Sequence, residues 1–355
     1  MITLAVAATP DELVPTAGRA LWDRDLLYRS MIRWGGGQVV PIEGRVAWRR
    51  AVGRAARAAS AVPGRSVRWR GSTPRRLLRD VAQVERVVVG ESVRAVFGNI
   101  VFPVARGLPT IWSTQGVIDA RPGSWFPEQS ARTHVKMANR AAVVQCWSEI
   151  GRAGILDRSP RLDPARVQVL PPIIYVDLPD VATPEEEGPP RALFVGAFGH
   201  LKALAEVVEA ARGLHGALVL DVVTNDPPPP DLPPWVRWLG PRPREEVLRL
   251  LVAADVHVFP STTESFGGVA VEALAAGVAQ VVDARGVPAE IAGDAALHVD
   301  GRDADSIGAA LQRLAGDAAL RSDLGRRALE RYRTAYAPEA IGPRFERLVD
   351  DAVSG

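Results

Sequence analysis

The stretch PSTTESFGGVAVEALAAG, residues 260–277, carries more information about fold and function than any other part of this 355-residue chain. The residues before it, 256–259 (VHVF), form a short apolar run that stops at Pro260, as a strand does when it enters a loop. Strong helix formers fill residues 270–276, and Gly277 follows where helices commonly end on a glycine. The stretch therefore predicts a strand, a tight loop and a helix.

Two glycines and two glutamates give this turn its chemistry. Gly267 and Gly268 stand where the helix begins, so a ligand can approach the backbone, and the first N–H groups and the helix dipole favour an anion. Glu264 lies in the loop and Glu272 inside the helix. A carboxylate only accepts hydrogen bonds, and its two oxygens suit the hydroxyls of a vicinal diol. The arrangement indicates a nucleotide-sugar site; the alternative is an ordinary solvated helix start, because short spacings recur by chance.

The same stretch, together with Gly286 and residues 290–296 (EIAGDAA), resembles the family 4 retaining glycosyltransferases of the two-domain B-type fold. The resemblance covers residues 190–350 well and the first 170 residues loosely. It implies an α/β protein of two Rossmann-like doubly wound domains that face a cleft, the GT-B type. It also implies that a hexosyl unit passes from a nucleotide diphosphate sugar to an acceptor hydroxyl with retention of configuration. GDP-mannose and UDP-hexoses both stay open as donors.

The resemblance implies roles for individual residues as well. Glu264 would hold hydroxyls of the donor sugar, Glu272 would hold the ribose diol, and Lys202 would contact the diphosphate. Lysine is a compact point charge suited to phosphate, and Lys202 is one of only two lysines among 43 Lys and Arg residues. We assign Glu264 and Lys202 as catalytic. The complete predicted donor set is Gly196, Lys202, Glu264, Ser265, Phe266, Gly267, Gly268, Val269 and Glu272.

The chain departs from the family pattern in three places. Ala197 stands where a basic residue usually follows the glycine that we match to Gly196. Residues 7–10 lack the glycine pair expected after the first strand. Gln115 replaces a histidine, and we name it with His134 as acceptor-side candidates, although His134 also fits a core or surface position.

Two alternative functions stay open, and the first of them is motivated by Ala197 and by the missing glycine pair. One is a non-catalytic subunit that binds a nucleotide sugar and supports a partner transferase. The other is a nucleotide-sugar epimerase of the same fold type, which would need no acceptor.

Strand-like and helix-like runs alternate along the chain, as in parallel sheets with crossover helices. We expect strands at residues 2–7, 37–42, 65–69, 86–91, 108–113, 142–147 and 166–170 in the first half, and at 191–195, 217–223, 236–239, 256–259, 279–283 and 296–299 in the second. We assign residues 1–172 to an acceptor-side domain, 173–190 to a linker and 191–336 to a nucleotide-sugar domain. The resemblance implies that a helix within 337–355 crosses back to the first domain.

The composition, 47% hydrophobic and 24% charged, is that of a globular protein. No run approaches the length of a membrane span, and the single cysteine, Cys146, lies in a strand-like run that predicts buried packing in a reducing compartment. We therefore expect a cytoplasmic protein. The net charge of +2 gives no general attraction to nucleic acid, so we expect no such partner.

A basic amphipathic helix is predicted at residues 47–62, inside an arginine-rich stretch at 45–79. Such a helix could dock on the inner face of an anionic membrane and reach a lipid-linked acceptor; a surface crossover helix is the alternative that we prefer.

Two Asp-X-Asp pairs have the spacing that metal-dependent transferases of another fold type use. The first is Asp23 with Asp25, and the second is Asp303 with Asp305. We expect Asp303 to cap a helix, and we expect no metal site and no cofactor, since glycine amides, a helix dipole and Lys202 can stabilise a diphosphate by themselves.

Overall fold

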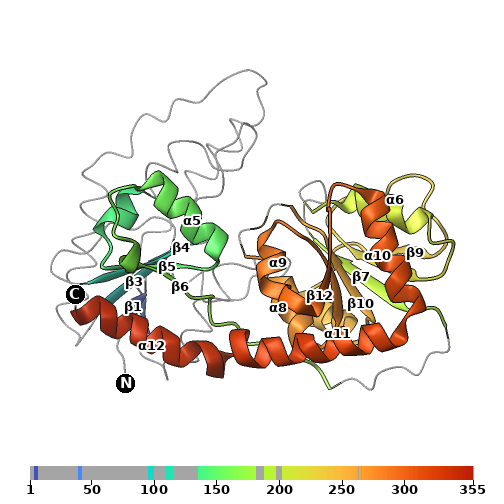
Figure 1. The fold of residues 1–355 in the computed structure, drawn as a ribbon. Coiled ribbons are helices and arrows are strands. Elements are labelled where there is room, and N and C mark those ends of the chain that lie inside the picture. The colour runs from blue at the N-terminus through green and yellow to red at the C-terminus, as the bar shows by residue number, and fades with distance from the viewer. Residues whose placement is uncertain are drawn as a thin grey trace.

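The computed structural model describes residues 4–6, 39–41, 95–99, 109–114, 135–180, 188–196, 202–262, 264 and 266–354. Within these residues the chain forms two six-stranded parallel sheets, each with helices packed on it (Figure 1). The two sheets belong to two domains, and a long helical segment runs along one side of both.

The first sheet has the order β2-β1-β3-β4-β5-β6. Its strands are β1 (Leu4–Val6), β2 (Val39–Pro41), β3 (Ala95–Asn99), β4 (Thr110–Thr114), β5 (Val143–Cys146) and β6 (Val167–Val169). The helix α5 (Glu149–Arg158) follows β5. Because β2 and β3 lie on opposite sides of β1, the sheet is doubly wound.

The second sheet has the order β12-β11-β10-β7-β8-β9. Its strands are β7 (Arg191–Val195), β8 (Val219–Val223), β9 (Val236–Trp238), β10 (Val256–Phe259), β11 (Ala279–Asp283) and β12 (Ala296–Val299). The helices of this domain are α6 (Leu204–Arg212), α7 (Arg244–Val252), α8 (Gly268–Ala275), α9 (Val287–Ala292), α10 (Ala304–Gly316) and α11 (Ala318–Arg331). Every residue of β10 and β11 is buried, as expected for central strands of a parallel sheet covered on both faces.

The last helix, α12 (Pro338–Ser354), packs against β3, β4 and β5 of the first sheet. A π-helical turn, Tyr332–Tyr336, joins it to α11. Its apolar side, with Phe345, Leu348 and Val349, is buried in one core cluster with residues of β4 and β5. The chain therefore reaches the first sheet again after completing the second domain.

The predicted strands match the observed ones wherever both lie in described residues, with one exception. Strand β3 was not predicted, because its sequence AVFGN contains glycine and asparagine, which are depleted in strands. The predicted strands at 65–69 and 86–91 and the predicted helix at 47–62 lie outside the described residues.

Loss of packing under α12 should destabilise the chain. Leu348 is 1% exposed, so we predict that Leu348→Ala lowers the free energy of unfolding by about 2–5 kcal/mol through the cavity it leaves. Val353, on the same helix, is 40% exposed, and Val353→Ala should change stability by no more than about 0.5 kcal/mol. Chemical denaturation measures both. Equal effects of the two substitutions would contradict the packing of α12 on the first sheet.

Candidate donor site

The loop between β10 and α8 brings the predicted donor residues to the carboxyl end of the second sheet. Gly267, the N-cap of α8, has φ 80° and ψ 54°, a left-handed conformation that glycine adopts without steric cost. The chain therefore turns sharply after the strand and starts a helix at Gly268. A glycine cap offers no side-chain acceptor to the first N–H groups of α8, which leaves that end of the helix suited to an anion.

Neighbouring loops hold the start of this turn in place. A Cβ atom on Gly301 would lie 2.1 Å from the carbonyl oxygen of Pro260, so only glycine fits there. The N–H of Gly301 donates to Asp283 Oδ2 at 2.9 Å, and the N–H of Arg285 donates to Oδ1 of the same carboxylate at 2.9 Å. A Cβ atom on Gly286 would lie 3.1 Å from the carbonyl oxygen of Ser261. The loops that follow β11 and β12 thus pack directly on the loop that follows β10.

Lys202 and Glu264 form an ion pair beside this loop, although they lie far apart in the sequence. Their side chains are 19% and 7% exposed, and Lys202 Nζ also lies 5.4 Å from the ring centroid of Phe259. A Cβ atom on Gly196 would lie 3.1 Å from Lys202 Cγ, so the glycine leaves room for the lysine stem. Burial lowers the pKa of Lys202 to about 8, while its pairing with Glu264 favours the charged form. The structure thus brings the two predicted catalytic residues together.

Glu272 is buried inside α8 at 1% exposure. Its Oε1 accepts a hydrogen bond from Arg244 Nε at 2.6 Å, and Arg244 Nη2 also donates to the carbonyl oxygen of Tyr175 at 3.0 Å. The pair links α7, α8 and the segment that leaves the first domain. The ribose contact of Glu272 stays a prediction.

The donor loop also touches the first domain. Phe266 packs edge-to-face on Trp147, which directly follows β5, with ring centroids 5.8 Å apart and planes at 81°. Trp147 Nε1 donates to Ser113 Oγ on β4 at 2.9 Å. Val269, three residues after Phe266, is 9% exposed and belongs to the same core cluster as Phe266 and Trp147.

Two of these partners were not identified from the sequence. Trp147 is an aromatic residue at the carboxyl end of a predicted strand, and that position is the feature from which a contact with the donor loop could have been predicted. Arg244 had no sequence signal, because its pairing with Glu272 joins two helices.

Several predicted residues lie outside the described part of the chain: Ser265, Gln115, His134, Ala197, Asp23 and Asp25. Among the described residues, no three His, Cys, Asp or Glu side chains form a group that could hold a metal ion. The predicted cap is confirmed, since Asp303 Oδ1 accepts from the N–H of Asp305 at 3.0 Å at the start of α10. Metal independence stays a prediction.

The packing role of Cys146 is confirmed. Its side chain is fully buried in β5, and burial raises the pKa of the thiol to about 12. A thiol with this pKa stays protonated near neutral pH and is a poor nucleophile.

Residues 231–331 match the family model described as glycosyl transferases group 1. The match lies within the second domain and makes that domain similar to the group 1 glycosyltransferases. The chain is 40% identical over 120 residues to D-inositol 3-phosphate glycosyltransferase of Corynebacterium diphtheriae, which covers 33% of this chain and 28% of that relative. It is 43% identical over 123 residues to the enzyme of the same name from Corynebacterium kroppenstedtii, covering 34% and 27%. The chain thus matches less than a third of the length of these curated relatives.

Solved structures resemble the whole fold of this chain. Sucrose-phosphate synthase from Thermosynechococcus elongatus has a TM-score of 0.71 and 17% identity over all of both chains. The HepE protein of Anabaena in complex with UDP and glucose has a TM-score of 0.71 and 13% identity, covering 99% of this chain and 100% of that one. At such identities the likeness concerns the fold alone, and it confirms the predicted two-domain GT-B class.

The left-handed turn at Gly267 gives a direct test of this site. We predict that Gly267→Ala costs about 1–2 kcal/mol of stability from backbone strain and weakens nucleotide binding, since its Cβ would also lie 3.2 Å from Phe259 Cε1. Gly316, the last residue of α10, has nothing within 4 Å of a Cβ atom, and Gly316→Ala should be neutral or stabilise by up to about 1 kcal/mol. Thermal denaturation and nucleotide titration of both variants measure the contrast. Similar effects of the two would contradict the assigned role of the turn.

Proposed function

We propose that this chain is a retaining glycosyltransferase that moves a hexosyl unit from a nucleotide diphosphate sugar to an acceptor hydroxyl. One observation carries the proposal: a partly buried Lys202–Glu264 pair lies beside a glycine-capped helix start, in a domain whose residues 231–331 match the group 1 glycosyltransferase family model.

The pair gives the leaving group and the sugar one partner each. As the glycosidic bond breaks, negative charge develops on the nucleotide diphosphate, and fixed donors lower the barrier most when they need no rearrangement. The ammonium of Lys202 and the first N–H groups of α8 would stabilise this charge. When the diphosphate replaces Glu264 as the ion-pair partner of Lys202, the Glu264 carboxylate can accept hydrogen bonds from the sugar hydroxyls. This scheme needs no metal ion, and the acceptor would enter on the face that the diphosphate leaves.

The donor and the acceptor are supported to different degrees. HepE was solved with UDP and with UDP-glucose, which supports a nucleotide diphosphate donor for the fold; UDP-hexoses and GDP-mannose are both candidates here. The curated relatives are named for D-inositol 3-phosphate, but they match only about a third of this chain. The family model likewise matches only residues 231–331, which lie within the second domain. The acceptor would bind from the first domain, where Gln115 and His134 are the candidate residues.

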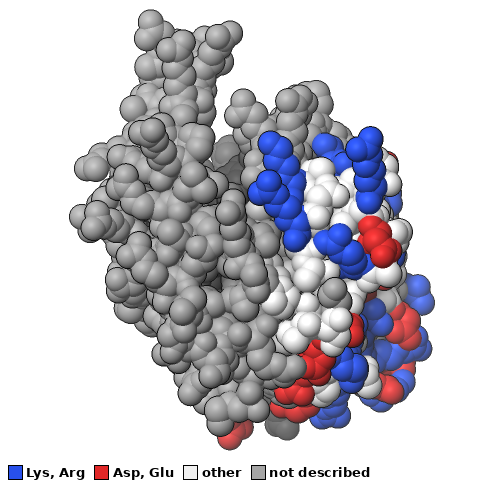
Figure 2. Space-filling view, turned by 90° about the vertical axis from the view of Figure 1, so that its left-hand side faces the viewer, with Lys and Arg blue, Asp and Glu red and all other residues white. Residues whose placement is uncertain are grey.

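A cytoplasmic location is part of this proposal; for residues 45–79 a surface crossover helix stays preferred, and contact with a membrane surface stays the alternative. In the described part of the chain, no helix combines the length and apolar character that crossing a bilayer requires. Figure 2 shows the end of the first domain that lies on the left in Figure 1. Lys and Arg side chains gather on the upper part of its described surface, and acidic side chains lie lower among further basic ones.

Turnover assays with UDP-glucose and GDP-mannose test the proposal. Glu264→Gln removes the charge that pairs with Lys202 and is expected to lower transfer about 100-fold or more, while Glu209→Ala, at a site 68% exposed on α6, should leave it unchanged. Nucleotide binding without turnover by the wild type would favour the non-catalytic subunit. Conversion of the donor sugar without an acceptor would favour the epimerase.

The charge of Lys202 should make nucleotide binding depend on pH. Because its pKa is lowered to about 8, the ammonium loses its proton as the pH rises through that value, and a diphosphate binds the charged form. We predict that the affinity for UDP or GDP falls above pH 8 in the wild type and that Lys202→Arg removes this fall, since a guanidinium stays charged. Calorimetric titration across this range measures it. Identical pH profiles of the two proteins would contradict the proposed phosphate contact.

A further inference from the structure

A carboxylate of the second domain caps a helix of the first. Glu290, in α9, accepts hydrogen bonds from the N–H of Glu149 to Oε2 at 2.8 Å and from the N–H of Ile150 to Oε1 at 2.9 Å. These are the first two residues of α5, whose own N-cap, Ser148, accepts from the N–H of Gly151 at 3.0 Å. The first N–H groups of a helix have no partner within it, so Glu290 completes a cap that Ser148 begins.

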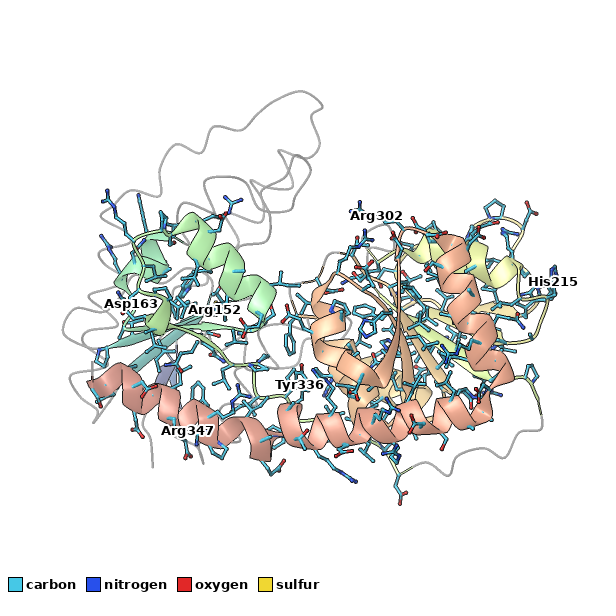
Figure 3. The ribbon with its side chains drawn as sticks, viewed as in Figure 1. Arg152, Asp163, His215, Arg302, Tyr336 and Arg347 are labelled. Atoms are coloured by element: carbon cyan, nitrogen blue, oxygen red, sulfur yellow. The ribbon has the colours of Figure 1, made fainter. Side chains whose placement is uncertain are left out.

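The main chain at Glu290 is fixed from the opposite side. Arg331, the last residue of α11, donates from Nη2 to the carbonyl oxygen of Glu290 at 2.6 Å and from Nε to that of Ile291 at 2.5 Å. The hydroxyl of Tyr336 donates to the Glu290 carbonyl at 3.4 Å, and the Arg331 guanidinium lies 6.0 Å from the Tyr336 ring centroid. Figure 3 shows Tyr336 below the junction of the two domains, where the chain passes from α11 toward α12.

Gly293 makes this anchoring possible. It has φ 55°, and a Cβ atom there would lie 2.7 Å from Arg331 Cζ. The guanidinium can therefore lie across the end of α9 and bind two successive carbonyl groups.

The same helix, α9, also touches the donor loop. A Cβ atom on Gly267 would lie 3.8 Å from Ile291 Cδ1, and the neighbouring Phe266 packs on Trp147, which precedes Ser148 in the chain. One short stretch of the first domain, from Trp147 to Ile150, is thus held at one end by the donor loop and at the other by Glu290.

We propose that Glu290 is a positioning residue that fixes the first domain against the donor loop by capping α5 with its carboxylate. A hydrogen bond to an ionised acceptor is stronger than a neutral one, and the positive end of a helix dipole adds to it. Group transfer depends on holding the two reactants in a near-attack geometry, so the spacing of the domains should set the transfer rate. This kinetic consequence rests on the proposed transferase function, whereas the contact itself does not.

One substitution removes half of the contact without disturbing α9. Glu149→Pro deletes the N–H that donates to Glu290 Oε2, at the first helical position, where proline is well tolerated. Ser148 before it is extended, with φ −150° and ψ 160°, as a residue before proline requires. Glu149→Ala is the matched control, because it removes the same side chain and keeps the N–H.

On the second-domain side, Glu290→Ala removes the contact completely and Glu290→Gln retains an uncharged acceptor. The exposed Glu209→Ala on α6 controls for loss of a carboxylate. We expect amide exchange at Glu149 and Ile150 to rise roughly five- to tenfold in Glu290→Ala, and less in Glu290→Gln. Exchange within residues 287–295 should stay unchanged, which separates loss of the contact from unfolding of α9.

Small-angle scattering and kinetics complete the test. Glu290→Ala and Glu149→Pro should increase the radius of gyration and lower kcat, with nucleotide affinity unchanged because the donor residues lie in the second domain. Glu149→Ala should behave as the wild type. If both Glu149 variants match each other and amide exchange of α5 is unaffected by Glu290→Ala, the positioning role is overturned. If the wild type transfers no sugar, exchange and scattering still decide whether Glu290 holds the domains, and only the transferase proposal fails.

Discussion

In the second domain, the left-handed backbone at Gly267 sets the position of the other donor-site groups. It lets the chain turn from β10 directly into α8, and that turn brings the first N–H groups of the helix, which have no side-chain cap from Gly267, to the carboxyl edge of the sheet. Close backbone contacts at Gly301 and Gly286 hold the loop that leads into it. A side chain at any of these glycines would move the loop, so the site depends on glycine for space as much as for flexibility.

The charged side chains around this turn are paired across distant parts of the chain. Lys202 meets Glu264 between two loops, and Arg244 meets Glu272 between two helices. Glu290 reaches the other domain. Buried charges are costly unless they are paired, and breaking such a pair costs more than its formation gains. These contacts therefore specify which elements meet, and the Lys202–Glu264 pair has the further property that a diphosphate could replace one of its partners.

The sequence predicted the local features of this domain well. The strand, loop and helix at residues 256–277 follow from apolar periodicity, a proline and three glycines, which act within a few residues of one another. The cap at Asp303 was predicted for the same reason. Strand β3 could not be predicted in this way, because its glycine and asparagine are unfavourable in strands. Pairing with β1 and β4 in the sheet stabilises it.

Contacts between distant segments could not be predicted in this way. Nothing around Arg244 indicates that α7 lies against α8. Glu290 was noticed only as part of a family-like run, because its function depends on the N-terminus of α5, more than a hundred residues earlier, lying opposite α9. The return of α12 to the first sheet was expected from resemblance and not from any residue pattern.

The most direct test of the central claim is a crystal structure of the chain with UDP or GDP bound. The account predicts the diphosphate at the start of α8, with its oxygens within about 3 Å of the N–H groups of Gly267 or Gly268 and of Lys202 Nζ. It also predicts that Lys202 has exchanged Glu264 for phosphate. A nucleotide bound elsewhere in the molecule, with the Lys202–Glu264 pair intact, would contradict it.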